Sequence, residues 1–172
     1  CLYDPMNEIY QPVDSTFILH LQQGETRILL QQNAEKREYS HTCPHPTTFT
    51  LSKKQNGTLS VIQENAGVGS VNKLFPDYSG EIVYECKICL DEGEYEWDFN
   101  AIGGCVKLTI DDKDLGFRFV APAKYRVRLG AGEHTVKYHF INTLGNEKYD
   151  TLSVYKEMEA FGLLELPTVK KA

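Results

Sequence analysis

Apolar and polar residues alternate along much of the chain, most clearly in its middle. Tyr95, Trp97 and Phe99 face one way in a short run, while Glu94, Glu96 and Asp98 face the other. A period of two is typical of a strand that buries one face and leaves the other in solvent. We therefore expect the three aromatic residues in a core and the three acidic residues on a solvated sheet face. The same pattern recurs in residues 82–90, 106–110, 125–129 and 136–140.

The spacing of these runs indicates an all-β chain. They recur about every 8–12 residues with turn residues between them, which is typical of an antiparallel β-sandwich or barrel. Helical periodicity is weak and confined to residues 153–161, and no alternation of strands with helices suggests a parallel sheet. The expected fold is an antiparallel β-sandwich.

Turn residues predict where this chain reverses. Asn56-Gly57 lies between two short apolar runs and predicts a hairpin, because both residues tolerate positive φ. Upstream, Phe17, Leu19 and Leu21 share a face and precede the run 28–30, which predicts an N-terminal hairpin. A polar stretch with Pro44 and Pro46 follows. We accordingly expect an N-terminal hairpin segment (1–32), a linker (33–47) and the sandwich (48–172).

Charge and hydropathy exclude two classes of partner. A formal charge of −6 and a pI near 5.4, with no cluster of Lys and Arg, argue against a nucleic-acid surface. No run approaches the ~18 consecutive apolar residues of a membrane span. We expect neither nucleic acid nor membrane as a partner.

The cysteines favour free thiols. Their number, five, prevents all of them from pairing within the chain, and the odd spacing of Cys86 and Cys89 sends them to opposite faces of a strand. Free thiols favour a reducing, cytoplasmic compartment, although the compartment itself is left open. Cys1 is interpreted as a domain boundary, with a lipid-bearing lipoprotein cysteine as the alternative.

Two clusters of ligand-type residues have simpler interpretations than a metal site. Asp111, Asp112 and Asp114 could supply oxygen ligands to calcium, but a charged hairpin turn is the favoured interpretation. His41 and His45 with Cys43 place three zinc-type ligands on one side of an extended segment, yet no fourth ligand is nominated and two prolines favour a loop. We therefore predict no metal and no cofactor.

A series of short motifs in residues 78–166 resembles the galactose-binding-like β-sandwich of bacterial glycoside hydrolases. The similarity is to the sugar-binding domain of family 2 enzymes (β-galactosidase and β-glucuronidase relatives) and to the C-terminal sandwich of large α-L-rhamnosidase-type enzymes. The matching segments, in the family's order, are 79–85, 97–100, 106–112, 115–116, Pro122 with Tyr125, 129–134, 142–146 and 162–164. Two positions depart from the pattern: the family's Asn-Gly turn is Asp111-Asp112 here, and the asparagine after its glycine turn is His134.

The N-terminal residues have a looser likeness of their own. Residues 4–10, 17–21 and 24–30 resemble the strands that end the preceding module of such enzymes, where the family has an Asp-Pro-x-Thr-Gly turn. This likeness implies a position at the C-terminal end of a longer glycosidase-like polypeptide.

Five loop residues are the candidates for carbohydrate contact. Sugar-binding modules stack an aromatic ring on the sugar and hydrogen-bond its hydroxyls with Asn, Asp and Arg. The candidates of these types are Tyr78, Arg118, Asn142, Asn146 and Tyr149. For each, a loop-bracing hydrogen bond or core packing is the structural alternative, and Asn142 is expected to satisfy backbone groups at a strand end.

The resemblance implies a non-catalytic accessory domain of a bacterial glycoside hydrolase. Its catalytic acids would lie in a separate barrel, so we predict no catalytic residue here; the catalytic domain would be the partner and a glycan the candidate ligand. The alternative is a purely structural or interaction sandwich without a sugar ligand. A small enzyme acting alone is a third possibility, tested by hydrolysis of nitrophenyl glycosides.

Overall fold

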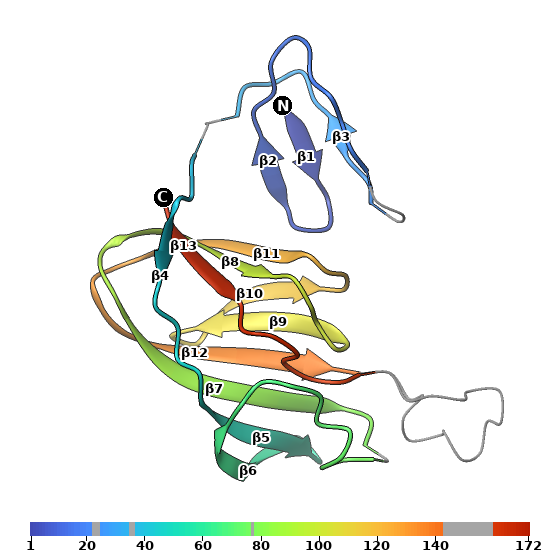
Figure 1. Ribbon diagram of the computed structural model, residues 1–172, viewed down its shortest axis with the longest axis vertical. Coiled ribbons are helices and arrows are strands. Elements are labelled where there is room, and N and C mark those ends of the chain that lie inside the picture. The colour runs from blue at the N-terminus through green and yellow to red at the C-terminus, as the bar shows by residue number, and fades with distance from the viewer. Residues whose placement is uncertain (22–24, 35–36, 77, 143–159) are drawn as a thin grey trace, which may run out of the picture.

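The computed structural model describes residues 1–21, 25–34, 37–76, 78–142 and 160–172, in which every regular element is a β-strand. The strands form three sheets in which every pairing is antiparallel (Figure 1). In spatial order, the largest sheet contains β10 (Lys113–Arg118), β9 (Cys105–Ile110), β12 (Gly132–Ile141), β7 (Glu81–Leu90), β5 (Phe49–Gln55) and β6 (Thr58–Ala66). The second contains β11 (Ala123–Leu129), β8 (Gly93–Phe99), β13 (Thr168–Lys171) and β4 (His41–Cys43). The smallest contains β2 (Ile9–Gln11), β1 (Leu2–Asp4) and β3 (Ile28–Leu29).

An aromatic core joins the two larger sheets. Phe99 of β8 meets Tyr138 of β12 edge-on, with ring centroids 5.4 Å apart at 84°. Trp97, which is fully buried, donates a hydrogen bond from Nε1 to the Tyr138 hydroxyl at 3.2 Å. A buried indole N–H needs such an acceptor. These contacts confirm the all-β sandwich and the core position predicted for Tyr95, Trp97 and Phe99.

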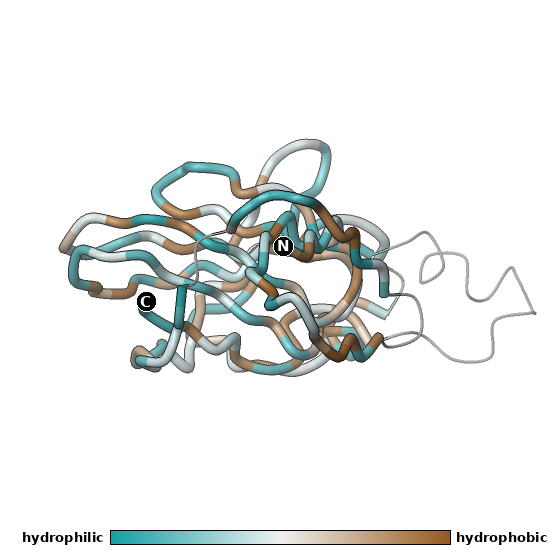
Figure 2. The backbone as a smooth tube through the Cα atoms, turned by 90° about the horizontal axis from the view of Figure 1, so that it is seen from above, coloured by the Kyte–Doolittle hydropathy of each residue, from teal (hydrophilic) through white to brown (hydrophobic). Residues whose placement is uncertain are grey.

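Hydropathy follows the strands as expected. In Figure 2, hydrophobic and hydrophilic stretches succeed one another along the tube. On β7 the inward Ile88 is buried, whereas the neighbouring Cys89 is exposed. Cys86 is buried on the inward face, so the two cysteines lie on opposite faces as predicted, and all five thiols of the chain are free.

Two hairpins turn through left-handed backbone. Asn56 (φ 51°) and Gly57 (φ 81°) connect β5 to β6, which confirms the predicted turn. Asp111 (φ 48°) and Asp112 (φ 63°) connect β9 to β10 in the same manner. Positive φ at both central residues matches the right-handed twist of the flanking strands. The acidic pair therefore occupies the turn where the resembled family has Asn-Gly.

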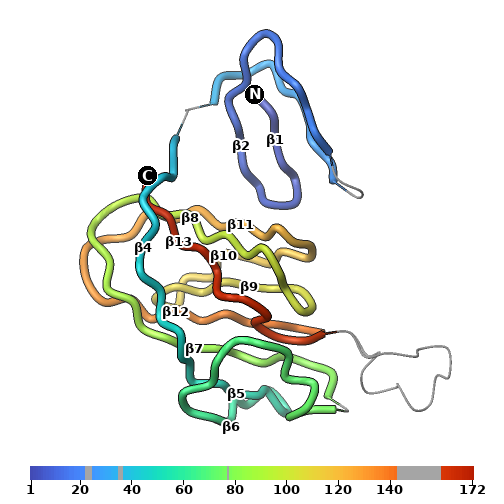
Figure 3. The backbone as a smooth tube through the Cα atoms, viewed as in Figure 1, coloured from blue at the N-terminus to red at the C-terminus, as the bar shows by residue number. Residues whose placement is uncertain are grey.

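The segment predicted as a linker contributes a strand to the sandwich. His41–Cys43 forms β4, which pairs with β13, and β13 in turn pairs with β8. Figure 3 follows this path from the N-terminal unit through β4 into β5, with the C-terminal strand beside β4. The division at 1–32, 33–47 and 48–172 itself stays a prediction.

The N-terminal unit differs from the predicted hairpin. The hairpin is formed by β1 and β2, and residues 17–21 contain no strand. Phe17, Leu19 and Leu21 are all exposed, so their alternation has no buried face to stabilise an extended ladder.

Candidate functional site

Two of the predicted sugar-binding residues brace a strand junction together. Asn142, directly after β12, donates from Nδ2 to the Tyr78 carbonyl at 2.8 Å and accepts the Gly80 N–H at 2.7 Å. The Tyr78 hydroxyl lies 2.6 Å from the carbonyl oxygen of Lys54 and 2.9 Å from that of Glu81. Bracing of backbone groups at the strand end, as expected for Asn142, is therefore what the geometry shows for both residues.

Arg118 has a different setting. It is buried at the end of β10, where its guanidinium stacks on the Tyr125 ring at 4.8 Å. Its Nη2 donates to the Asn7 carbonyl at 3.1 Å and lies 3.0 Å from the Glu8 carboxylate. Arg118 thus attaches the β1–β2 hairpin to the sandwich. Asn146 and Tyr149 lie outside the described residues, and sugar binding by this set of five stays a prediction.

The β1–β2 turn docks onto the edge of the sandwich through one amide. The Asn7 side chain accepts the Lys124 N–H at 2.7 Å and donates to the Pro122 carbonyl at 3.2 Å. It thereby satisfies one donor of β11, an edge strand of the four-stranded sheet, and one acceptor of the residue that directly precedes this strand. Asp4 accepts from both the backbone N–H and the side-chain amide of Asn7, at 3.2 and 2.9 Å, which fixes the orientation of the amide.

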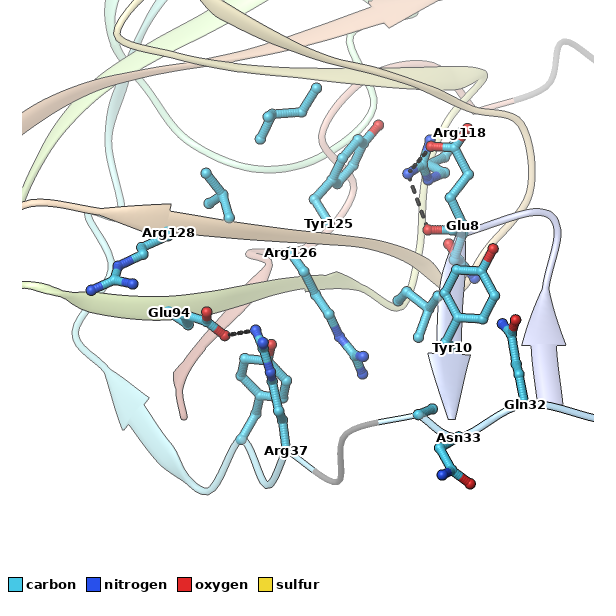
Figure 4. A pocket seen from close by; sticks show the side chains of 16 residues that line it. Glu8, Tyr10, Gln32, Asn33, Arg37, Glu94, Arg118, Tyr125, Arg126 and Arg128 are labelled. Carbon is cyan, nitrogen blue, oxygen red and sulfur yellow. Dashed lines mark hydrogen bonds and ion pairs between the residues drawn. The ribbon is translucent and has the colours of Figure 1, made fainter. Parts of the chain in front are cut away.

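A cleft of about 580 Å³ lies beside this junction, between the N-terminal unit and the sandwich. This volume is within the range of pockets that hold small ligands. Its labelled walls are visible in Figure 4. The lining residues are Asn7, Glu8, Ile9, Tyr10, Gln32, Asn33, Ala34, Arg37, Tyr39, Glu94, Leu115, Arg118, Tyr125, Arg126, Val127 and Arg128.

Opposite charges face each other across the two strands beneath the cleft. On the outward face, Lys124, Arg126 and Arg128 of β11 are in register with Asp98, Glu96 and Glu94 of β8. Arg126 Nε donates to Glu96 at 2.8 Å, and Lys124 Nζ lies 3.0 Å from Asp98.

The solvated face predicted for these carboxylates is wrong for two of them. Glu96 and Asp98 are only 4% and 8% exposed, because cationic side chains of the next strand cover them. Burial of a carboxylate is tolerable when it is paired and hydrogen-bonded in this way. Both faces of β8 are therefore covered at these positions: the face with Trp97 by the apolar core, and the face with Glu96 and Asp98 by cationic side chains.

Arg126 presents part of its guanidinium to the cleft. Its Nε is held by Glu96, and the ring of Tyr39 lies 4.8 Å from its guanidinium carbon. Within the described part of the chain, neither Nη group has a hydrogen-bond partner. In Figure 4 the side chain extends from β11 into the space in front of Tyr10 and Arg37.

The chemistry of the cleft favours binding over catalysis. Its two lining carboxylates are both ion-paired with arginine, Glu94 with Arg37 and Glu8 with Arg118. A general acid of a glycosidase needs the opposite setting, an environment that favours the protonated carboxyl. Exposed guanidinium N–H groups and side-chain amides instead suit anions and hydroxyl groups.

Of the residues that build this cleft, sequence reasoning named Arg118 and missed the residues of the Arg126 setting and the Asn7 junction. Asn7 was noticed only as part of the motif 4–10, and Arg126 only as a polar position of an alternating strand. The signal that could have found Arg126 is the cationic series on β11 against the acidic series on β8, which is visible once the two strands are paired.

The ligand-type residues near β4 do not form a metal site. His45 points to the Tyr138 hydroxyl, while His41 is exposed, so the three residues 41, 43 and 45 do not converge. Among the described residues, no group of three or more His, Cys, Asp or Glu side chains could hold a metal ion. The same part of the chain has no helix long and apolar enough to cross a membrane.

No protein-family model and no curated protein matches this chain. Its fold is similar to part of a rhamnosidase from Novosphingobium sp. PP1Y, with a TM-score of 0.62 and 16% identity over 87% of this chain and 16% of that one. It is also similar to part of a GH2 beta-galacturonidase from Eisenbergiella tayi, with a TM-score of 0.57 and 18% identity over 73% and 23% of the two chains. A third similar structure is a Faecalibacterium prausnitzii beta-glucuronidase, with a TM-score of 0.51 and 11% identity over 81% of this chain and 33% of that one. The chain thus shares its fold with a minor part of these longer glycosidase chains.

Proposed function

We propose that this chain is a non-catalytic accessory domain of a bacterial glycoside hydrolase, with a galactose-binding-like jelly-roll sandwich. The observation that carries the proposal is the repeated likeness to a minor part of longer glycosidase chains, at 23% of the beta-galacturonidase and 16% of the rhamnosidase. The ordered motifs in residues 78–166 support the same assignment. Because the lining carboxylates of the cleft are ion-paired, the catalytic acids would be supplied by another domain.

Packing against that domain is the first part of the proposed role. The N-terminal unit exposes an unusual amount of apolar side chain: Ile18 is 84% exposed, Leu29 64% and Leu21 52%. Contiguous apolar patches on a soluble protein commonly mark an interface. The catalytic domain of the parent glycosidase is the proposed partner for this surface.

Holding a glycan is the second part. A polar cleft beside the domain junction, lined by arginines, amides and Tyr10, has the donors that sugar hydroxyls need. A sandwich with no sugar ligand is the competing function. It is favoured by Tyr78, Asn142 and Arg118, whose polar groups are occupied by the chain itself.

Two experiments test the accessory role. The coding sequence on both sides of this chain should encode a catalytic barrel with two essential carboxylates. The chain alone should not hydrolyse nitrophenyl glycosides, whereas the parent protein should. Turnover by the isolated chain, abolished by substitution of one of its own carboxylates, would overturn the proposal.

A glycan-binding screen separates the two versions of the role. Binding of any mono- or oligosaccharide that Tyr10→Ala weakens would support a sugar site in the cleft. If no saccharide binds, the purely structural accessory domain is the supported function.

A further inference from the structure

The Arg126 guanidinium is oriented before any ligand arrives. Its Nε is tied to Glu96, whose side chain is 6% exposed, and one face is covered by Tyr39. The Arg126 side chain itself is 30% exposed, so its Nη edge remains accessible from the cleft. A planar carboxylate can accept two parallel N–H groups from such an edge. Since the arginine is already ordered, little side-chain entropy is lost on binding.

The opposite wall carries groups suited to a hydroxylated ring. Tyr10 of β2 is 46% exposed and packs against the Tyr3 ring, with ring centroids 4.7 Å apart and the planes tilted by 31°, which holds its ring in place. Gln32 and Asn33 line the same wall, and Figure 4 shows both amides on the far side of the cleft from β11. Amides both donate to and accept from hydroxyl groups.

The charge of the lining favours an anion. Four arginines line the cleft against two glutamates, on a chain whose formal net charge is −6. Arg37 and Arg118 are paired with the two glutamates, and Arg128 lies 3.4 Å from Glu92. Glu96 lies beneath the cleft and holds Arg126 from behind. Arg126 is therefore the arginine whose charge is directed at the open volume.

We propose that this cleft binds the carboxylate of an acidic sugar, a hexuronic acid residue, on the Nη edge of Arg126. The sugar ring lies against Tyr10, and its hydroxyl groups reach Gln32 and Asn33. The inference rests on the proposed glycan-holding function and specifies its ligand class. A neutral sugar can make only the ring contacts, and a small inorganic anion can make only the contact to Arg126.

Calorimetric titration with matched sugars tests the proposal. The probes are galacturonic and glucuronic acids and their disaccharides, the neutral sugars galactose and glucose, and the methyl esters of the two acids. The acids should bind at least about tenfold more tightly than their esters and neutral counterparts, because only the carboxylate can accept the charged pair of hydrogen bonds. Acetate and phosphate serve as small-anion probes.

Matched variants locate the site. Arg126→Gln should weaken binding of the acid at least about tenfold and leave binding of the ester unchanged. Because this change also leaves buried Glu96 without its partner, near-ultraviolet circular dichroism must show that the variant is folded. Gln32→Glu is the second variant, since it adds an exposed negative charge to the wall and should weaken binding of the acid more than binding of the ester. Gln63→Glu makes the same change on exposed β6 and should have no effect.

The outcomes separate this inference from the function on which it rests. Equal binding of acid, ester and neutral sugar would overturn the acidic ligand and leave a glycan-holding domain. Binding of acetate as tight as that of the uronic acids would also overturn it, because the ring would contribute nothing. Binding of no probe would overturn the inference, while the accessory role is still decided by gene context and hydrolysis.

Discussion

At the scale of single residues, the side chain of Asn7 holds the β1–β2 turn against the sandwich. It is 7% exposed and connects the backbone of β11 with the β1–β2 turn. Asn7→Ala leaves a half-buried N–H and a half-buried carbonyl without partners, which should lower the free energy of unfolding by about 1–3 kcal/mol. Urea denaturation measures this loss, and amide exchange at Lys124 should accelerate.

Two further variants sharpen the test of Asn7. Asn7→Asp should lower the free energy of unfolding more than Asn7→Ala does. A carboxylate cannot donate to the Pro122 carbonyl, and it would face Asp4, whose Oδ2 lies 2.9 Å from the present amide nitrogen. Asn33→Ala makes the alanine change at an exposed position and should leave stability unchanged. Stability of Asn7→Ala equal to that of the native chain would contradict the role of this amide at the junction.

Asp111 in the β9–β10 turn and His134 on β12 form a pH-dependent pair. His134 Nδ1 lies 2.6 Å from Asp111 and Nε2 lies 3.0 Å from the Gly130 carbonyl, so both nitrogens face acceptors. The hydrogen bond to Asp111 raises the pKa of His134 above its usual 6.5, and the bond to His134 lowers the pKa of Asp111 below 3.8. Stability from the imidazolium is therefore complete below pH 6.5 and is lost as pH rises through the raised pKa. The part due to Asp111 is lost as pH falls through its lowered pKa.

His134→Gln should consequently destabilise the chain more at about pH 5.5 than at about pH 8.5. Denaturant titrations at the two pH values measure the difference, and His20→Gln at an exposed position is the control. An equal loss at both pH values would show that the imidazole contributes packing without its charge.

Sequence patterns could locate the core residues of this chain but not its candidate site. Trp97 and Phe99 follow from alternation alone, because burial on one face of a strand is a local property. The setting of Arg126 is non-local, since Glu96 and Tyr39 contact it from two separate segments and Tyr10 lines the same cleft from a third. Arg118 can be named as a candidate from its residue type, yet its place beside Asn7 depends on docking of a hairpin 111 residues away in the sequence.

At the scale of elements, long strands were predictable and short ones were not. β7 and β12 each alternate over ten residues, and the Asn56-Gly57 turn defines its hairpin chemically. β4 has three residues and β13 has four, which is too few to display a period. They are extended because each supplies hydrogen bonds to the other and β13 also pairs with β8. Residues 17–21 show the opposite case: their apolar and polar residues alternate, but they pair with no strand of the described chain and form none.

The position of β13 predicts that the last strand is essential for the sandwich. Val169 is 1% exposed and is the cross-strand neighbour of Trp97, so β13 both completes the core and joins β8 to β4. Deleting residues 168–172 should lower the stability by about 3 kcal/mol or more, since a buried valine and two rows of backbone bonds are lost together. Emission of Trp97, the single tryptophan, should shift toward that of the unfolded chain.

A double substitution separates the contribution of the β13 backbone and Val169 from that of the two lysine charges. Lys170→Gln with Lys171→Gln keeps the backbone and Val169, and should retain the native emission spectrum. If this double variant unfolds as completely as the truncated chain, the loss of stability is due to charge and not to the strand.

At the scale of the whole molecule, the N-terminal unit carries apolar side chains that the described part of the fold leaves uncovered. Ile18 and Leu29 are the most exposed of them. In Figure 1 this unit stands apart from the two larger sheets, which it meets through the β1–β2 turn. Its apolar surface therefore has to be covered by another domain or remain in water.

Substitution of this surface should change association without changing the fold. Ile18→Gln with Leu29→Gln removes two large exposed apolar side chains and no described core contact, so the midpoint of thermal unfolding should be unchanged. Sedimentation velocity of the isolated chain should show less concentration-dependent self-association in the variant, because apolar area available for contact between copies is reduced. Val61→Gln removes one exposed apolar side chain of β6 and is the matched comparison, which should reduce self-association less than the double variant does. A variant that self-associates as strongly as the native chain would show that this surface does not drive contact, and the partner domain would then have to bind elsewhere.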